Sequence, residues 1–479
     1  MFTVNYSRSL ENFLKTIPFI DELQELPQEI EEFAGAIIGF SSAELIRDII
    51  NSFYRFFDQV NDQVFQILET ISGINLENFV YLIRWDGHND LERWKLVLPD
   101  GTPIKIKQTI HQIGISRDYV VLMDTAFITG IEQIINNPIP ENKELEQLLR
   151  ELLEKAPNPD SAIYIVRRQD LTRGQYLALG EEEVKVVAQQ LTIPIEAAHF
   201  LMDYENPNGE MTLHIAHICA WNVAEWMHPY DVSPYQDCSF VSQRIHAMES
   251  SEMDISRLGR YVIDAEQGEL VKSQLVSETP STWGTGLYAF LDRLPSGKPP
   301  SRLDNIYWAS LGLWEELMTE FGRELFEDYK YRAIPIDEVL ELAKKGIPSS
   351  LFRVDTNKMV LEDSYQFPTG YIGSSPQFIP KQDSDGNSTD GYLICTVFTP
   401  ENSEFWLFDG KKLSQGPVCQ LSHPSLNFGF SLHTTWLPAI GHRQAKYNIP
   451  VSLDYQAVVN QQSDSMIREL FEKEIYPHF

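Results

Sequence analysis

Three histidines lie in apolar, strand-like segments of this 479-residue chain and have side chains that could do chemistry. They are His111 in TIHQIGISRDYVVLMDTAF, His217 in EMTLHIAHICAWNVAEW and His433 in LSHPSLNFGFSLHTTWLP. A neutral imidazole binds metal ions, and it also gains or loses a proton close to neutral pH. A lone histidine on a strand is more often an ordinary hydrogen-bonding residue, so the surrounding segments must decide between these interpretations.

The other eight histidines have weaker claims to a site. His214 lies three residues before His217, so on a strand the two face opposite sides and only one can point into a shared site. His88 stands in the turn-like WDGHND and is predicted to be solvated. The remaining six are interpreted as structural residues: His199, His228, His246, His423, His442 and His478.

Short strand-like runs separated by turns must position these side chains. Between residues 79 and 125 the runs FVYLIRW, ERWKLVL and DYVVLMD alternate with Asp-Gly turns at 86–87 and 100–101, which is typical of antiparallel sheet. Similar runs return as SAIYIVRR, DGYLICTVF and SEFWLFDGKKL. This spacing predicts a closed, mainly β architecture, and a β-sandwich with a helical domain stays open because periodicity does not count strands per sheet.

Amphipathic patterns predict helices at a few places. Residues 41–72 carry apolar side chains at every third or fourth position, after a capping-box pair formed by Ser41 and Glu44. Further helical inserts are predicted near residues 130–155, 181–200 and 303–345. We therefore expect an N-terminal helical region over residues 1–78, followed by a β domain over residues 79–479 that carries these inserts as a cap.

Composition excludes several classes of protein. With 69 acidic and 38 basic residues the formal net charge is -31, which repels phosphate backbones and argues against a nucleic-acid partner. The four cysteines are far apart, which argues against a zinc site or a disulfide framework. The N-terminus lacks a secretory pattern, and no apolar run is long enough to span a bilayer. We expect a cytoplasmic protein, with the FAGAIIGF stretch at residues 33–40 as a candidate for peripheral membrane contact.

The histidine segments resemble, in the same order along the chain, motifs of the carotenoid cleavage oxygenase family. The resemblance runs from about residue 81 to residue 438. It includes GRYVIDAEQGELVKSQLVSETPSTW, which is similar to a family strand that ends in Glu-Phe-Pro, and SSPQFIPKQDSDGNSTDGYLICTVF, which is similar to a Glu-Pro strand and its hairpin. The resemblance implies a seven-bladed β-propeller with helical insertions that form a cap.

The same resemblance implies a site and an activity. His111, His217 and His433 would be ligands of a non-haem Fe(II), and the motif favours His217 over His214. Glu278 would be a carboxylate that orients one imidazole. The implied reaction is cleavage of a carbon–carbon double bond in an apolar carotenoid-, apocarotenoid- or stilbene-like substrate by dioxygen, with the residue 79–479 domain as the catalytic unit.

Two departures from the family pattern leave alternatives open. Residues 1–87 contain no histidine, although the family has its first ligand there, and Ser375 stands before Pro376 where the family has a glutamate. Iron could be held by three histidines, or His214 or His88 could act as a substitute fourth ligand. The third alternative is a metal-poor propeller that binds an apocarotenoid-like ligand without cleaving it, and an isomerase-type relative is also open.

Overall fold

Four sheets make up the β part of the molecule. The computed structural model describes residues 1–7, 78–87, 91–127, 147, 150, 156–177, 180–235, 239–437, 451–461 and 465–478. The first sheet has seven strands in the order β1-β2-β3-β7-β6-β5-β4. In chain order its strands are β1 (Phe2–Ser7), β2 (Phe79–Arg84), β3 (Glu92–Val97), β4 (Thr109–Ile115), β5 (Tyr119–Thr125), β6 (Asp160–Arg167) and β7 (Lys185–Pro194).

The other three sheets each have four antiparallel strands that follow one another in the chain. The second contains β8 (His199–Met202), β9 (Glu210–His217), β10 (Arg257–Asp264) and β11 (Glu269–Val276). The third contains β12 (Thr285–Ala289), β13 (Asn305–Ser310), β14 (Ser350–Asp355) and β15 (Val360–Gln366). The fourth contains β16 (Ile372–Pro380), β17 (Gly391–Phe398), β18 (Ser403–Asp409) and β19 (Cys419–Leu421).

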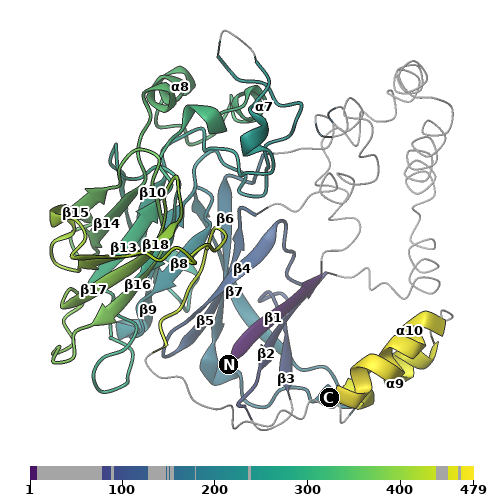
Figure 1. Cartoon of the computed structure of the whole chain (residues 1–479). Helices are drawn as coiled ribbons and strands as arrows, with labels where there is room; N and C mark the ends of the chain where they lie inside the picture. The colour runs from purple at the N-terminus through teal and green to yellow at the C-terminus, as the bar shows by residue number, and fades with distance from the viewer. Residues whose placement is uncertain are drawn as a thin grey trace, which may run out of the picture.

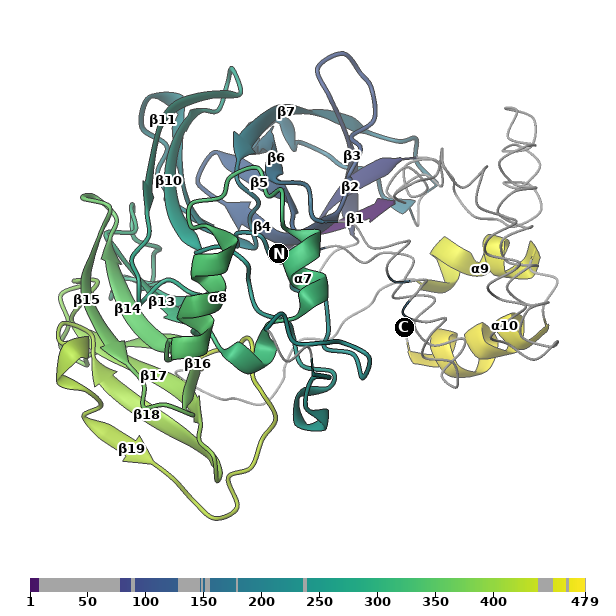
Figure 2. The ribbon, with the colours of Figure 1, turned by 90° about the horizontal axis from the view of Figure 1, so that it is seen from above.

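These sheets are arranged as the blades of a propeller. Strands β4 to β7 form a four-stranded unit of the same kind within the first sheet, and β3 joins it through a parallel pairing with β7. Figure 2 shows the blades side by side along an arc, with β11, β15 and β19 on the outer side and β4 and β16 on the inner side. The mainly β, propeller-like fold class is therefore confirmed.

Apolar side chains fill the spaces between neighbouring blades, because alternate residues of each strand face opposite sides. Met123 and Ile165 of one blade pack with Phe200 and Ile215 of the next. The same arrangement recurs between the second and third sheets, and again between the third and fourth. Face-to-face packing of this kind fixes the inner strands relative to one another, which is what a site on the propeller axis needs.

Two helices, α7 (Glu320–Leu325) and α8 (Ile336–Lys345), cover one end of the blades (Figure 1). The Thr319 side chain caps α7 by accepting a hydrogen bond from the Gly322 N–H. The buried face of α8 packs on Met253 and Leu313. The predicted cap of helical insertions is present here. Among the described residues the other helices are α9 (Val451–Gln461), α10 (Ser465–Leu470), a π-helix at Phe471–Ile475 and short 3-10 turns at Arg168–Asp170, Pro207–Gly209, Gln243–Ile245, Glu315–Leu317, Leu413–Gln415 and Tyr476–His478.

Three expectations about the elements differ from the structure. The segment 181–200 is not a helical insert, because residues 185–194 form β7 and His199 begins β8. Residues 2–7 within the supposed helical region pair with β2 as strand β1. The insert predicted near 303–345 begins with strand β13 and only then becomes helical. The predicted helix at 41–72 and most of the insert near 130–155 lie outside the described residues.

Among the described residues no helix is long and apolar enough to cross a membrane.

Candidate metal centre

Bulges interrupt three of the four inner strands at the level of the candidate site. In β4 the pairing with β5 shifts between Ile110 and Ile113, so two consecutive residues, His111 and Gln112, oppose one. In β12 the shift places Gly286 outside the ladder, and in β16 it releases Ser375 and the following proline. A bulge redirects side chains away from the regular alternation of a strand. The inner strands can therefore turn polar groups toward a common point.

Three histidines meet at this point: His111 from β4, His199 from β8 and His433 from the segment after β19. One ring nitrogen of each lies within 4.8 Å of those of the other two. The Nε2 atoms of His111 and His199 are 3.2 Å apart, and the rings of His199 and His433 have centroids 5.2 Å apart. The structure thus brings together two of the three predicted histidines and adds His199.

The electrostatic environment keeps two of these rings neutral. Burial, then the neighbouring His111 and His433 rings, lowers the pKa of His199 to about 3. Burial, followed by the His433 ring, also lowers the pKa of His111 below its ordinary value. A protonated imidazole cannot bind a cation, so lowered pKa values prepare both rings as ligands at neutral pH.

The contact between His111 and His199 fits a shared metal ion. Two imidazole nitrogens bound about 2.1 Å from one ion lie roughly 3 Å apart, close to the separation in this structure. The Nδ1 atom of His199 is buried without a hydrogen-bond partner among the described residues. If Nδ1 carries the proton, the lone pair on Nε2 is free for a metal. The three side chains therefore fit a metal ion with open coordination positions.

Two serines of the β16 bulge hold the segment that carries His433. The hydroxyl of Ser374 donates to the Ser431 carbonyl over 2.7 Å, and the hydroxyl of Ser375 lies 2.9 Å from that of Thr434. Thr434 in turn donates to the Ser375 carbonyl at 3.2 Å. Both serines are buried, and Ser375 has a φ of 45°. These bonds fasten the chain on either side of the exposed His433.

Aromatic side chains and one glycine form the rest of the surroundings. The ring of Phe127 stacks on His111 with centroids 4.2 Å apart, and Tyr288 meets the edge of His199 at 5.7 Å. A Cβ atom at Gly286 would stand 3.9 Å from the His199 Nδ1 atom, so the glycine leaves room there. The site is polar at its centre and apolar around it.

His217 does not reach this centre, and its assignment as a ligand must be corrected. It lies on β9, the second strand of its blade, and is fully buried between strands. Its Nδ1 atom is 3.0 Å from the Glu196 carbonyl and its Nε2 atom 2.8 Å from the Tyr261 hydroxyl, so both nitrogens have partners. Gly259 provides the space for this ring.

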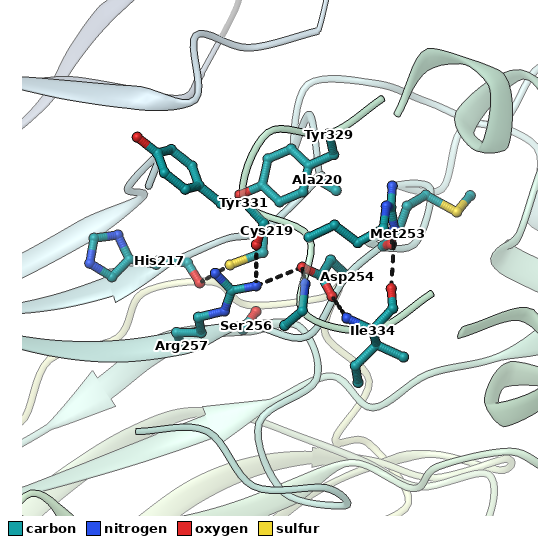
Figure 3. A network of polar contacts seen from close by, with 12 residues as sticks. His217, Cys219, Ala220, Met253, Asp254, Ser256, Arg257, Tyr329, Tyr331 and Ile334 are labelled. Carbon is teal, nitrogen blue, oxygen red and sulfur yellow. Dashed lines mark hydrogen bonds and ion pairs between the residues drawn. The ribbon is translucent and has the colours of Figure 1, made fainter. Parts of the chain in front are cut away.

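The surroundings of His217 belong to a polar network that supports the cap (Figure 3). Arg257, which pairs with His217 across β9 and β10, contacts Asp254 at 2.7 Å and donates to the Tyr331 carbonyl. Asp254 accepts hydrogen bonds from the backbone N–H groups of residues 333 and 334. The network joins the segment between α7 and α8 to the second blade.

Glu278 is not placed to orient an imidazole. It follows β11, the outer strand of its blade, and its side chain is exposed. Its backbone N–H donates to the Thr282 hydroxyl, and its carbonyl accepts from the following turn. Of the two substitute ligands, His214 is buried against Asp203 at 3.0 Å, and His88 lies outside the described residues.

His199 was interpreted as a structural residue because no family motif was matched to it, and its segment was also included in a predicted helical insert. The inner strand β8 has only four residues, HFLM, and follows β7 closely, so no long alternating pattern marks it. The available signal was positional: His199 begins the strand that pairs with β9, just as His111 lies on the strand that begins the preceding blade.

A cleft of about 560 Å³ lies elsewhere, and none of the three histidines lines it. Four arginines line it: Arg84, Arg117, Arg167 and Arg168. The first three pair with Glu92, Glu205 and Asp170, and Arg168 donates to backbone carbonyls. These guanidinium groups are therefore occupied in holding the fold, and the histidine cluster remains the stronger candidate site.

One protein family and several solved structures are similar to this chain. The family described as Retinal pigment epithelial membrane protein, RPE65, matches residues 74–438. The chain therefore belongs to this family of carotenoid oxygenases and isomerases. No curated protein shows significant sequence similarity to the chain.

Solved structures of similar proteins include two oxygenases. Lignostilbene dioxygenase from Pseudomonas brassicacearum is 14% identical with a TM-score of 0.42, and the alignment covers 76% of this chain and 63% of that one. Cobalt-substituted apocarotenoid oxygenase from Synechocystis is 15% identical with a TM-score of 0.40, covering 75% of this chain and 60% of that one. The chain thus spans less than two thirds of the length of either structure.

Proposed function

We propose that this protein is a non-haem Fe(II) dioxygenase that cleaves a carbon–carbon double bond in an apolar carotenoid-, apocarotenoid- or stilbene-like substrate. The observation that carries the proposal is the meeting of His111 and His199, from inner strands of two different sheets, with His433 from the segment after β19. Membership of the carotenoid oxygenase and isomerase family supports the same class of substrate.

The three histidines would hold the iron, each through one ring nitrogen. Bound there, ferrous iron would supply the open coordination positions at which dioxygen and an alkene are brought together. The protein's own contribution is to hold neutral rings in place and to surround them with apolar side chains. Phe127 beside His111 and Tyr288 beside His199 would keep water away from the reacting bond.

Exposed apolar residues in the segment that carries His433 support a hydrophobic substrate. Four large apolar residues near His433 are about half exposed: Phe430, Leu432, Trp436 and Leu437. Exposed apolar residues gathered in one short segment are typical of a surface that receives an apolar ligand or touches a lipid surface. We propose that the substrate enters here, in a cytoplasmic protein with peripheral membrane contact.

Metal analysis combined with a cleavage assay tests the proposal. Protein purified with Fe(II) under reducing conditions is expected to hold about one iron per chain and to convert an apocarotenoid or stilbene to carbonyl products with uptake of dioxygen. His199→Ala is expected to lose both iron and activity. As a matched control, His217→Gln should retain iron, because His217 lies outside the centre.

Each other outcome points to a different function. Less than about a tenth of an equivalent of iron, unchanged in His199→Ala, would contradict the enzyme proposal and favour a propeller that only binds its ligand. Full iron occupancy with an isomerised product and no uptake of dioxygen would assign the chain to the isomerase branch of the family.

A further inference from the structure

Gln112 lies beside His111 in the β4 bulge, and its side chain contacts the two following blades. Its amide N–H donates to the Phe200 carbonyl at 2.7 Å, and its amide oxygen accepts from the Phe200 N–H at 3.1 Å. The same amide nitrogen lies 3.1 Å from the Tyr288 hydroxyl. One side chain of β4 thus contacts two other inner strands, β8 and β12.

The two bonds to Phe200 imitate a rung of β-sheet between strands that belong to different sheets. Strands β4 and β8 lie in separate sheets, so no continuous backbone ladder joins them. Gln112 directly follows His111, and Phe200 directly follows His199. The amide pair therefore fixes the relative position of the two residues next to the histidines, whose Nε2 atoms are 3.2 Å apart.

We propose that Gln112 is a positioning residue that sets the separation of His111 and His199 and thereby the metal affinity of the centre. The inference rests on the proposed function, since it assumes that these histidines bind a metal. Gln112 does not itself touch the ion. It acts through Phe200, and through Tyr288 it also aligns the ring that borders His199.

The chemistry of the amide explains why other side chains would not serve. Glutamate could accept from the Phe200 N–H, but its carboxylate would oppose the Phe200 carbonyl oxygen instead of donating to it. Methionine has a similar size and forms neither strong bond, so both polar groups of the Phe200 backbone would lose their partner. Asparagine is shorter by one methylene and cannot reach both groups from the same backbone.

Titration with Co²⁺ of the full-length chain tests this role without requiring activity. Gln112→Glu, Gln112→Met and Gln112→Asn are each expected to weaken Co²⁺ binding by about ten- to a hundredfold, the range typical of residues that support metal ligands. The visible absorption of bound Co²⁺ should also change, because the two imidazoles are no longer held at the same separation. The control is Gln190→Glu, the same substitution at an exposed position of β7. It should leave the Co²⁺ affinity and the visible absorption of bound Co²⁺ unchanged.

Hydrogen exchange in the metal-free protein provides a second readout. The Phe200 amide should exchange faster in Gln112→Met than in the unchanged chain, because its acceptor is gone. Comparing three substitutions of different size keeps the test valid if one of them does not fold. If every folded Gln112 variant matches the unchanged chain in Co²⁺ affinity and in exchange at Phe200, the role proposed for Gln112 is wrong and the proposed function still stands. Failure of the unchanged chain to bind Co²⁺ would overturn the proposed function and this inference together.

Discussion

His433 depends on two hydroxyl contacts for its position, because it lies in an exposed segment without regular secondary structure. Ser374 and Ser375 approach that segment only because β16 bulges there, which turns consecutive residues outward. The sequence resemblance has a glutamate at the place of Ser375, and a short hydroxyl serves a different purpose from a carboxylate. It bonds the side chain of Thr434, the residue after the ligand, rather than the ligand's ring.

Removing the Thr434 hydroxyl should loosen His433. Thr434→Val keeps the shape of the side chain but loses both contacts with Ser375, so we expect Co²⁺ affinity to fall by about tenfold. Thr434→Ser keeps the hydroxyl and should retain most of the affinity. Equal binding by the valine and serine variants, measured by the same titration, would show that the hydrogen bonds between Thr434 and Ser375 do not position His433.

Whether a site residue could be predicted from the sequence depended on the strand or segment that carries it. His111 and His433 were found because their segments match family motifs, whereas His199 lies on a four-residue strand whose pattern is too short to recognise. The bulges of β4, β12 and β16 were not predictable, since a bulge depends on pairing with the neighbouring strand. His217 was misassigned because the family motif was matched to its segment, and that match does not reveal which strand of the blade lies innermost.

The segment that joins α7 to α8 should be sensitive to the loss of one buried carboxylate. Asp254 is fully buried and bonds Arg257 as well as two backbone N–H groups of this segment. Asp254→Asn leaves Arg257 without its counter-charge, so we expect the free energy of unfolding to fall by about 3 kcal/mol. Urea denaturation measures this loss. Asp304→Asn, which removes an exposed partner 3.5 Å from Arg302, is the control and should cost less than about 0.5 kcal/mol.

At the scale of the whole molecule, buried titratable groups make stability depend on pH. Burial raises the pKa of the Glu196 carboxyl to about 7, partly opposed by hydrogen bonds from Tyr329 and Ala220. The folded state then keeps a proton that the unfolded chain releases near its ordinary value of 4.5. Because the folded state binds more protons in this range, Glu196 lowers stability as the pH rises toward 7.

Glu196→Gln should remove this dependence. Between about pH 5 and about pH 8 the unchanged chain should lose roughly 2–3 kcal/mol of stability relative to the variant, since each unit of pKa shift corresponds to about 1.4 kcal/mol. Urea unfolding of both proteins across this range is the measurement. Parallel stability curves for the two proteins would show that Glu196 is ionised in the folded state throughout.

More of the fold class than of the site could be predicted from the sequence. Short strands and Asp-Gly turns indicated a mainly β protein, and the packing of apolar residues between blades agrees with that prediction. The division of strands into blades came only from the family resemblance, because a parallel pairing such as β3 with β7 joins segments about 90 residues apart. Local patterns carry no information about contacts at that distance.

The central claim is that His111, His199 and His433 bind one metal ion. Anomalous X-ray diffraction at the iron edge, from crystals of the Fe(II)-loaded protein, locates the ion directly. The account predicts a single strong peak between the three imidazoles, about 2.1 Å from a ring nitrogen of each. A peak beside His217, or no peak at the three histidines despite measured iron in the crystals, would contradict it.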